Sequence, residues 1–224
     1  MNILALETST EFCSVALLLN DDIVHQEQHA ENRHSELILT MINDVLQECA
    51  LSLQQITSIA FGEGPGSFTG LRIACGVAQG LAFAKNIPVV GVSTLKAVAH
   101  QANKPKIIVA LDARMGEIYH AAFERLNDFE WNTIQKATLC NPESAPTLTG
   151  KGWIGCGNGF AIFKNELCKR YENNIDGFRT ELHPRAKEIA ELALPIFMHG
   201  KGIHPSGATP SYIRNKVALK ESER

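Results

Sequence analysis

The glycine-rich turn at residues 62–67, GEGPGS, is the stretch with the clearest capacity for chemistry. The amides from Gly66 to Thr69 would open onto the N-terminus of a helix, where they could bind an anion. The pattern differs from a Walker phosphate loop, because no Gly-Lys-Ser/Thr follows. It also differs from the G-x-S-x-G elbow of serine hydrolases, because Gly70 comes three residues after Ser67 rather than two. Gly66 and Ser67 are therefore candidates for anion binding rather than for nucleophilic catalysis.

A second polar turn, Glu7-Thr8-Ser9-Thr10, follows the apolar run that ends at Leu6. An acidic residue at the end of a first strand, followed by hydroxyl residues and a hairpin, resembles the first phosphate loop of sugar-kinase and actin-like proteins. In those proteins the carboxylate orients a metal–nucleotide. This resemblance makes Glu7 and Ser9 further candidates for a nucleotide site. A polar strand end that faces solvent is the simpler alternative.

The residue types that bind metals show no ligand-like spacing. The six cysteines form no C-x-x-C pair, and most have apolar neighbours, as reduced core cysteines do. His25 and His29 would share a face of a helix, but their segment has the pattern of a strand, which holds them too far apart for easy shared ligation. We therefore predict no metal ion held by this chain alone.

The composition is that of an ordinary globular protein. The chain has 224 residues, of which 45% are hydrophobic and 20% charged, and its formal net charge is −3. That charge argues against a broad basic surface for nucleic acid, and leaves a local basic patch as the alternative. No run approaches the roughly 20 apolar residues of a membrane span, and the N-terminus lacks the pattern of a signal peptide. We expect a cytoplasmic protein that does not bind membranes.

The helix predicted from Thr69 to Lys85 contains unusually many small residues. Gly76 and Gly80 lie one turn apart on the same face of it. Each interior glycine costs about 0.8–1 kcal/mol relative to alanine, so close approach of another backbone is the natural compensation. That backbone belongs either to the same domain or to another subunit. Arg72, alone among apolar residues, either extends its charge to the surface, pairs with a carboxylate such as Glu63, or acts as an interface anchor.

A helix predicted from His34 to Ala50, with Ser35 as its cap, carries an apolar stripe wide enough to pack on a sheet and to present an edge to another helix. The predicted strands lie at residues 2–6, 12–19, 23–29, 58–62, 87–92, 106–111, 117–125 and 153–156. Shorter helices are predicted at residues 94–102, 160–171 and 184–199. Residues 128–152 are expected to form loops.

The two halves of the chain repeat one pattern of strand, acidic turn and strand hairpin, with Glu7 in the first copy and Asp112 in the second. Such duplication indicates two related lobes. The polar, helix-stopping segment Asn103-Lys104-Pro105 is the best boundary, so we predict an N-terminal lobe at 1–103 and a C-terminal lobe at 104–224. The last residues are expected to be mobile unless a partner orders them.

Five strings in the chain resemble the bacterial TsaB (YeaZ) proteins: MNILALETST…CSVAL, FGEGPGSFTGLRIACGVAQGLA, GVSTLKAVA, LDARMGEIY and PSYIRNKVA. Together they cover nearly the whole chain. The resemblance implies an α/β, two-lobed fold of the actin/sugar-kinase/heat-shock (ASKHA) type with duplicated mixed-sheet lobes. It also implies a non-catalytic role in forming N6-threonylcarbamoyladenosine in tRNAs that read codons beginning with A.

Partners follow from the same resemblance. A TsaB-like subunit binds a TsaD-like paralogue that carries the metal and transfers the threonylcarbamoyl group, and a TsaE-like ATPase joins the pair. The assembled complex would use ATP and Mg²⁺, and would carry the contact with tRNA. The helices at 34–50 and 69–85 would form the shared surface, which would give a homodimer when the partner is missing. The implied interface residues are Leu37, Ile38, Met41, Val45, Arg72, Cys75, Gly76 and Gly80.

Two other functions stay open at this point. One is a nucleotide-binding enzyme of the kinase-like fold that uses Glu7, Ser9 and the turn at 64–67. Many family members have aspartate where this chain has Glu7, and the longer side chain casts doubt on that role. The other is a metallopeptidase, for which the sequence offers no evident ligands.

Overall fold

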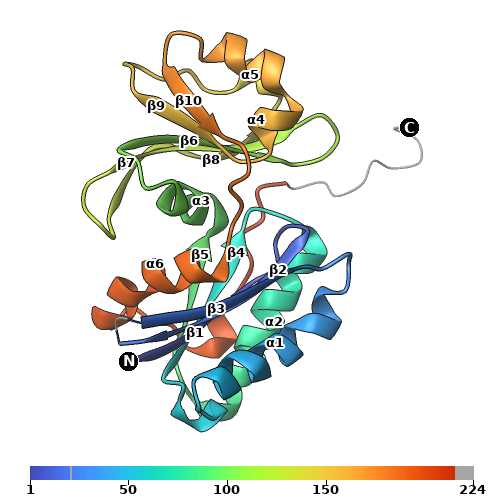
Figure 1. The fold of residues 1–224 in the computed structure, drawn as a ribbon, viewed down its shortest axis with the longest axis vertical. Coiled ribbons are helices and arrows are strands. Elements are labelled where there is room, and N and C mark those ends of the chain that lie inside the picture. The colour runs from blue at the N-terminus through green and yellow to red at the C-terminus, as the bar shows by residue number, and fades with distance from the viewer. Residues whose placement is uncertain (21, 215–224) are drawn as a thin grey trace.

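Two mixed β-sheets, one from each half of the chain, form the framework of the protein (Figure 1). The structure, a computed structural model, describes residues 1–20 and 22–214. The first sheet has the order β3-β2-β1-β4-β5, with β1 (Asn2–Glu7), β2 (Phe12–Leu19), β3 (Asp22–His29), β4 (Ser58–Gly64) and β5 (Val89–Ser93). The second has the order β10-β9-β6-β7-β8, with β6 (Lys106–Asp112), β7 (Ile118–Arg125), β8 (Trp131–Cys140), β9 (Trp153–Cys156) and β10 (Ile175–Arg179).

The two sheets repeat one topology. β1 pairs antiparallel with β2 and parallel with β4, just as β6 pairs antiparallel with β7 and parallel with β9. The strand–turn–hairpin pattern that occurs twice in the sequence is therefore a structural repeat. The prediction of a two-lobed α/β fold with duplicated mixed sheets is confirmed.

The longer helices cover both faces of the first sheet (Figure 1). α1 (His34–Glu48) and α2 (Phe68–Lys85) pack on one face, and their inner residues share a hydrophobic cluster with β1, β2 and β4. α6 (Ala186–Met198) packs on the opposite face, and α3 (Thr94–Ala102) lies between the two sheets. The short helices α4 (Gly159–Ile162) and α5 (Lys164–Arg170) cover the second sheet on its other face. Single 3₁₀ turns occur at Leu53–Gln55, Pro142–Ser144 and Pro205–Gly207.

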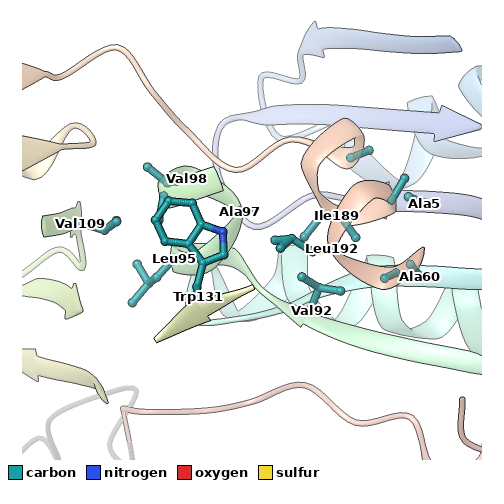
Figure 2. Close-up of a cluster of buried hydrophobic side chains, with 14 of the residues drawn as sticks. Ala5, Ala60, Val92, Leu95, Ala97, Val98, Val109, Trp131, Ile189 and Leu192 are labelled. Atoms are coloured by element: carbon teal, nitrogen blue, oxygen red, sulfur yellow. The ribbon is translucent and has the colours of Figure 1, made fainter. Parts of the chain in front are cut away.

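One hydrophobic cluster joins the two sheets through α3. Figure 2 shows Leu95, Ala97 and Val98 of α3 beside Val109 and Trp131 of the second sheet, with Val92 of β5 on the other side. The cluster continues through Ile189 and Leu192 of α6 to Ala5 and Ala60 of the first sheet. The core thus crosses residue 103, and the second half of the chain supplies α6 to the first sheet. The boundary at 103 stays a prediction.

Several local expectations need correction. Residues 131–140 of the segment expected as loop form β8, an edge strand whose outer residues Asn132, Thr133 and Lys136 are exposed. Because one edge and much of one face meet solvent, the strand lacks an apolar signature. The expected helix at 160–171 is two helices, interrupted at Phe163.

Helix caps and chain ends agree with expectation only in part. Ser67 caps α2, where its Oγ accepts a hydrogen bond from the Gly70 amide at 3.3 Å. Ser35 does not cap α1, whose N-cap is Arg33 without a side-chain bond. No element was expected at β10, a short and mostly exposed edge strand. The expected mobility of the last residues concerns 215–224, which lie outside the described residues.

Candidate functional site

A cleft of about 860 Å³ lies between the two lobes. The turn after β1, the N-terminus of α2, the turn after β6 and residues 211–214 line it. A smaller pocket, of about 420 Å³, lies between α3, α6 and the turn after β7. Of the four residues expected at a nucleotide or anion site, Ser9, Gly66 and Ser67 line the larger cleft, whereas Glu7 is buried behind them and accepts a hydrogen bond from the Ser9 amide.

Close backbone contacts hold these residues together. The Ser67 amide donates to the Ser9 carbonyl at 2.8 Å, and the Ser9 amide donates to Glu7 Oε1 at 2.5 Å. A Cβ at Gly66 would lie 2.6 Å from the Ser9 Cβ, so only glycine fits there. The sequence thus correctly identified two turns that meet in space. The simpler alternative, a polar strand end that faces solvent, is wrong, because Glu7 is only 1% exposed.

The carboxyl group of Glu7 is unusual because it is buried. Burial raises its pKa to about 6, against the hydrogen bond from Ser9, which lowers the pKa. Its Oε2 has no hydrogen-bond partner among the described residues, and neither has Ser9 Oγ. When ionised, Glu7 places a negative charge close behind Ser9, which disfavours an anion beside that residue.

The second copy of the acidic turn does not supply a compensating cation. Arg114 lies 3.4 Å from Asp112, and Arg214 lies 2.7 Å from Glu117. These are the two arginines that line the cleft within the described residues, and both are paired with carboxylates. An anion at the N-terminus of α2 would therefore rely on backbone amides and on hydroxyl groups such as Ser9 Oγ rather than on an unpaired arginine.

The described part of the chain contains no group of three or more histidine, cysteine or acidic side chains that could hold a metal ion. His25 and His29 lie on β3, and the strand predicted for them is confirmed. None of the helices seen in residues 1–20 and 22–214 is both long enough and apolar enough to cross a membrane.

The outer face of α2 is an open stripe. Residues 68, 72, 76, 80 and 84 follow at intervals of four along the helix and all are exposed. A Cβ built on Gly76 or Gly80 would meet no atom within 4 Å. Close packing within the same domain, one of the two explanations for these glycines, is therefore ruled out by the described residues. Partly buried apolar residues of α2 flank the stripe: Ile73, Val77 and Leu81.

Four of the residues predicted for an interface are core residues instead. Ile38, Met41 and Val45 of α1 are at most 1% exposed, and Cys75 of α2 is 5% exposed. They pack with Leu4, Leu6 and other residues of the first sheet. A partner could not reach their side chains, so they support the surface from beneath. Leu37, Arg72, Gly76 and Gly80 remain accessible.

Arg72 lies at one end of the glycine stripe in an aromatic setting. Its guanidinium carbon is 3.7 Å from the centroid of the Phe68 ring, and its Nε donates to the Tyr212 hydroxyl at 2.9 Å. Of the two alternatives to an interface anchor, the ion pair with Glu63 does not form, whereas the exposed side chain agrees with a charge that extends to the surface. Tyr212 is not predictable as a partner from the sequence, because 140 residues separate it from Arg72. The signal that could have indicated it is the string PSYIRNKVA.

The chain is similar to known proteins along nearly its whole length. The family model described as TsaD, tRNA N6-adenosine threonylcarbamoyltransferase, matches residues 21–193. The tRNA threonylcarbamoyladenosine biosynthesis protein TsaB of Haemophilus influenzae is 37% identical, over 99% of this chain and 97% of the relative. TsaB of Escherichia coli is 36% identical, over 99% and 98%.

Solved structures show the same fold. YeaZ from Pseudomonas aeruginosa superposes with a TM-score of 0.87 at 34% identity, covering 94% of this chain and 99% of the other. A second structure, of a protein described as similar to peptidase YeaZ from Pseudomonas aeruginosa, has a TM-score of 0.88, covering 95% and 99% at 34% identity. Identity above one third along nearly the full length of both chains shows that this protein belongs to the TsaB (YeaZ) family.

Proposed function

We propose that this chain is a non-catalytic scaffold subunit in the biosynthesis of N6-threonylcarbamoyladenosine in tRNA. It would act in the cytoplasm, where it binds a TsaD-like catalytic subunit and, together with that subunit, a TsaE-like ATPase. Contact with tRNA and use of ATP and Mg²⁺ would belong to the assembled complex. The names of its relatives support the pathway.

The open glycine stripe on α2 is the observation that carries the scaffold role. Gly76 and Gly80 together cost about 2 kcal/mol of helix propensity relative to alanine. No described residue approaches either of them to offset that cost. A helix of another subunit could pack against α2 at this stripe with its backbone unusually close, which would account for both glycines. A second copy of this chain could use the same face in a homodimer.

The interlobe cleft supports a non-catalytic role. The buried carboxyl group of Glu7 accepts a hydrogen bond from the Ser9 amide. The two arginines that line the cleft, Arg114 and Arg214, are paired with Asp112 and Glu117. A phosphate group in the cleft would find no unpaired arginine among the described residues that line it. The alternative of a nucleotide-binding enzyme rests on the N-terminus of α2 and the unpartnered Ser9 Oγ. Saturable ATP binding by the isolated chain that Glu7→Ala abolishes would favour that alternative.

Sizing chromatography tests the scaffold role. The chain is run alone and mixed with the TsaD-like protein of the same cell. We expect a dimer alone that exchanges into a one-to-one complex with the TsaD-like protein. A chain that elutes unchanged in the presence of that protein would refute the proposal.

A further inference from the structure

We propose that Tyr212 positions Arg72 so that the free edge of its guanidinium binds a carboxylate of the catalytic partner. This inference rests on the proposed function, because it concerns the same stripe on α2. It adds the chemical group that the partner must present. It also assigns a role to a residue that lies far from α2 in sequence.

The side chain of Arg72 is held on two sides. The Phe68 ring lies under the guanidinium, and Tyr212 accepts a hydrogen bond from Nε and stands 5.3 Å from Phe68, centroid to centroid. These contacts leave the two terminal nitrogens of Arg72 without a hydrogen-bond partner among residues 1–20 and 22–214. A guanidinium presents its N–H groups in a rigid fork that matches a carboxylate in a bidentate pair.

The segment that carries Tyr212 is itself anchored at both ends. The Ser211 amide donates to the Glu63 carbonyl at 2.7 Å, which fixes the segment beside β4. Arg214 reaches the other lobe, where it pairs with Glu117 at 2.7 Å and donates to the Ala113 carbonyl at 3.0 Å. Tyr212 is therefore placed by contacts on either side of it, and it restricts the rotamers that Arg72 can adopt.

The charge of Arg72 indicates what the partner must supply. The other residues of the stripe, Phe68, Gly76, Gly80 and Ala84, carry no charge. No carboxylate of the described residues lies within 4.0 Å of Arg72. A helix packed on the stripe would remove Arg72 from water, and a buried unpaired charge is strongly unfavourable. An aspartate or glutamate on the partner would satisfy it.

The test is a double-mutant cycle measured by calorimetric titration with the TsaD-like protein. It uses the wild type, Tyr212→Phe, Arg72→Ala and the double variant, with Arg179→Ala as a control at an exposed arginine of β10. Arg72→Ala should weaken binding roughly 30-fold or more and flatten its salt dependence. Tyr212→Phe should weaken binding roughly 3- to 10-fold in the wild type and less than about 2-fold beside Arg72→Ala, since it acts only through Arg72.

The outcomes separate this inference from the function on which it rests. An equal loss from Tyr212→Phe in both backgrounds, or no loss in the wild type, would overturn the positioning role while leaving the scaffold role intact. Full binding by Arg72→Lys would also overturn it, because lysine keeps the charge but has no fork. Failure of the wild type to bind the TsaD-like protein would overturn both.

Discussion

Replacing Gly76 and Gly80 by alanine should make the isolated chain more stable and its complex weaker. In an exposed helix interior, alanine is favoured over glycine by about 0.8–1 kcal/mol at each site. Neither new methyl group would meet an atom within 4 Å, so no packing strain reduces that gain. The two changes together should add about 2 kcal/mol to the free energy of unfolding. For a chain of this size that is a rise in Tm of about 4–8 °C.

The matched control is Gly70→Ala on the same helix. A Cβ at Gly70 would lie 1.9 Å from the carbonyl oxygen of Thr8, which is backbone and cannot move aside. This change should lower stability by about 1–3 kcal/mol or more. The same substitution, glycine to alanine, should therefore lower the stability at Gly70 and raise it at Gly76 and Gly80.

Stability is measured by denaturant unfolding of the isolated chain at low protein concentration, because a homodimer through the same face would add its own stabilisation. Binding to the TsaD-like protein is measured in parallel. Each added methyl group would hold the partner backbone away, so affinity should fall at least tenfold for the double variant. Unchanged or lower stability would show that the glycines have contacts within the chain. Higher stability with unchanged affinity would place the interface elsewhere.

Three further predictions concern buried groups. Because burial raises the pKa of Glu7 from 4.5 to about 6, the folded state binds its proton more tightly; relative to Glu7→Gln, the wild type should lose about 2 kcal/mol of unfolding free energy between pH 4.5 and 7.5. The contribution of His120 to stability should change with pH in the opposite direction, because burial lowers its pKa from 6.5 to about 4. Relative to His120→Gln, the wild type should lose about 3 kcal/mol as the pH falls from 7.5 to 4. Urea titrations of each pair across pH check both, and parallel curves for a pair would contradict that prediction. Leu95→Ala, in the cluster that joins the two sheets, should cost about 2–5 kcal/mol of unfolding free energy; two separate transitions instead of one lowered transition would show that the lobes unfold independently.

The sequence predicts those parts of the fold that local patterning determines. The strand hairpins of both sheets alternate or run apolar between clear turns, and their duplication follows directly. The edge strands of the second sheet, β8 and β10, were not predicted because solvent covers part of their surface, as the exposed Asn132, Thr133 and Lys136 of β8 show. The position of α6 against the first sheet escaped for another reason. An amphipathic pattern identifies the buried face of a helix but not the sheet that buries it.

The candidate site shows the same division. Two turns with chemical potential, around Glu7 and around Gly66, are visible in the sequence, but their contact through Ser9 is not. The burial of Glu7 depends on a carboxylate that folds back onto the amide of its own loop, and no spacing rule predicts that. Tyr212 reaches Arg72 across 140 residues.

The glycines of the turn and of α2 illustrate why sequence alone leaves function open. Gly66 and Gly70 are required by the chain itself, since the backbone of Ser9 or Thr8 occupies the space where a side chain would lie. Gly76 and Gly80 are also four residues apart, yet a Cβ on either of them would meet no atom of another part of the described chain. A glycine in the sequence indicates that a side chain would be unfavourable at that position, and only the structure shows which neighbouring atoms are the reason. Where nothing does, as on the outer face of α2, the missing neighbour is the partner that we propose.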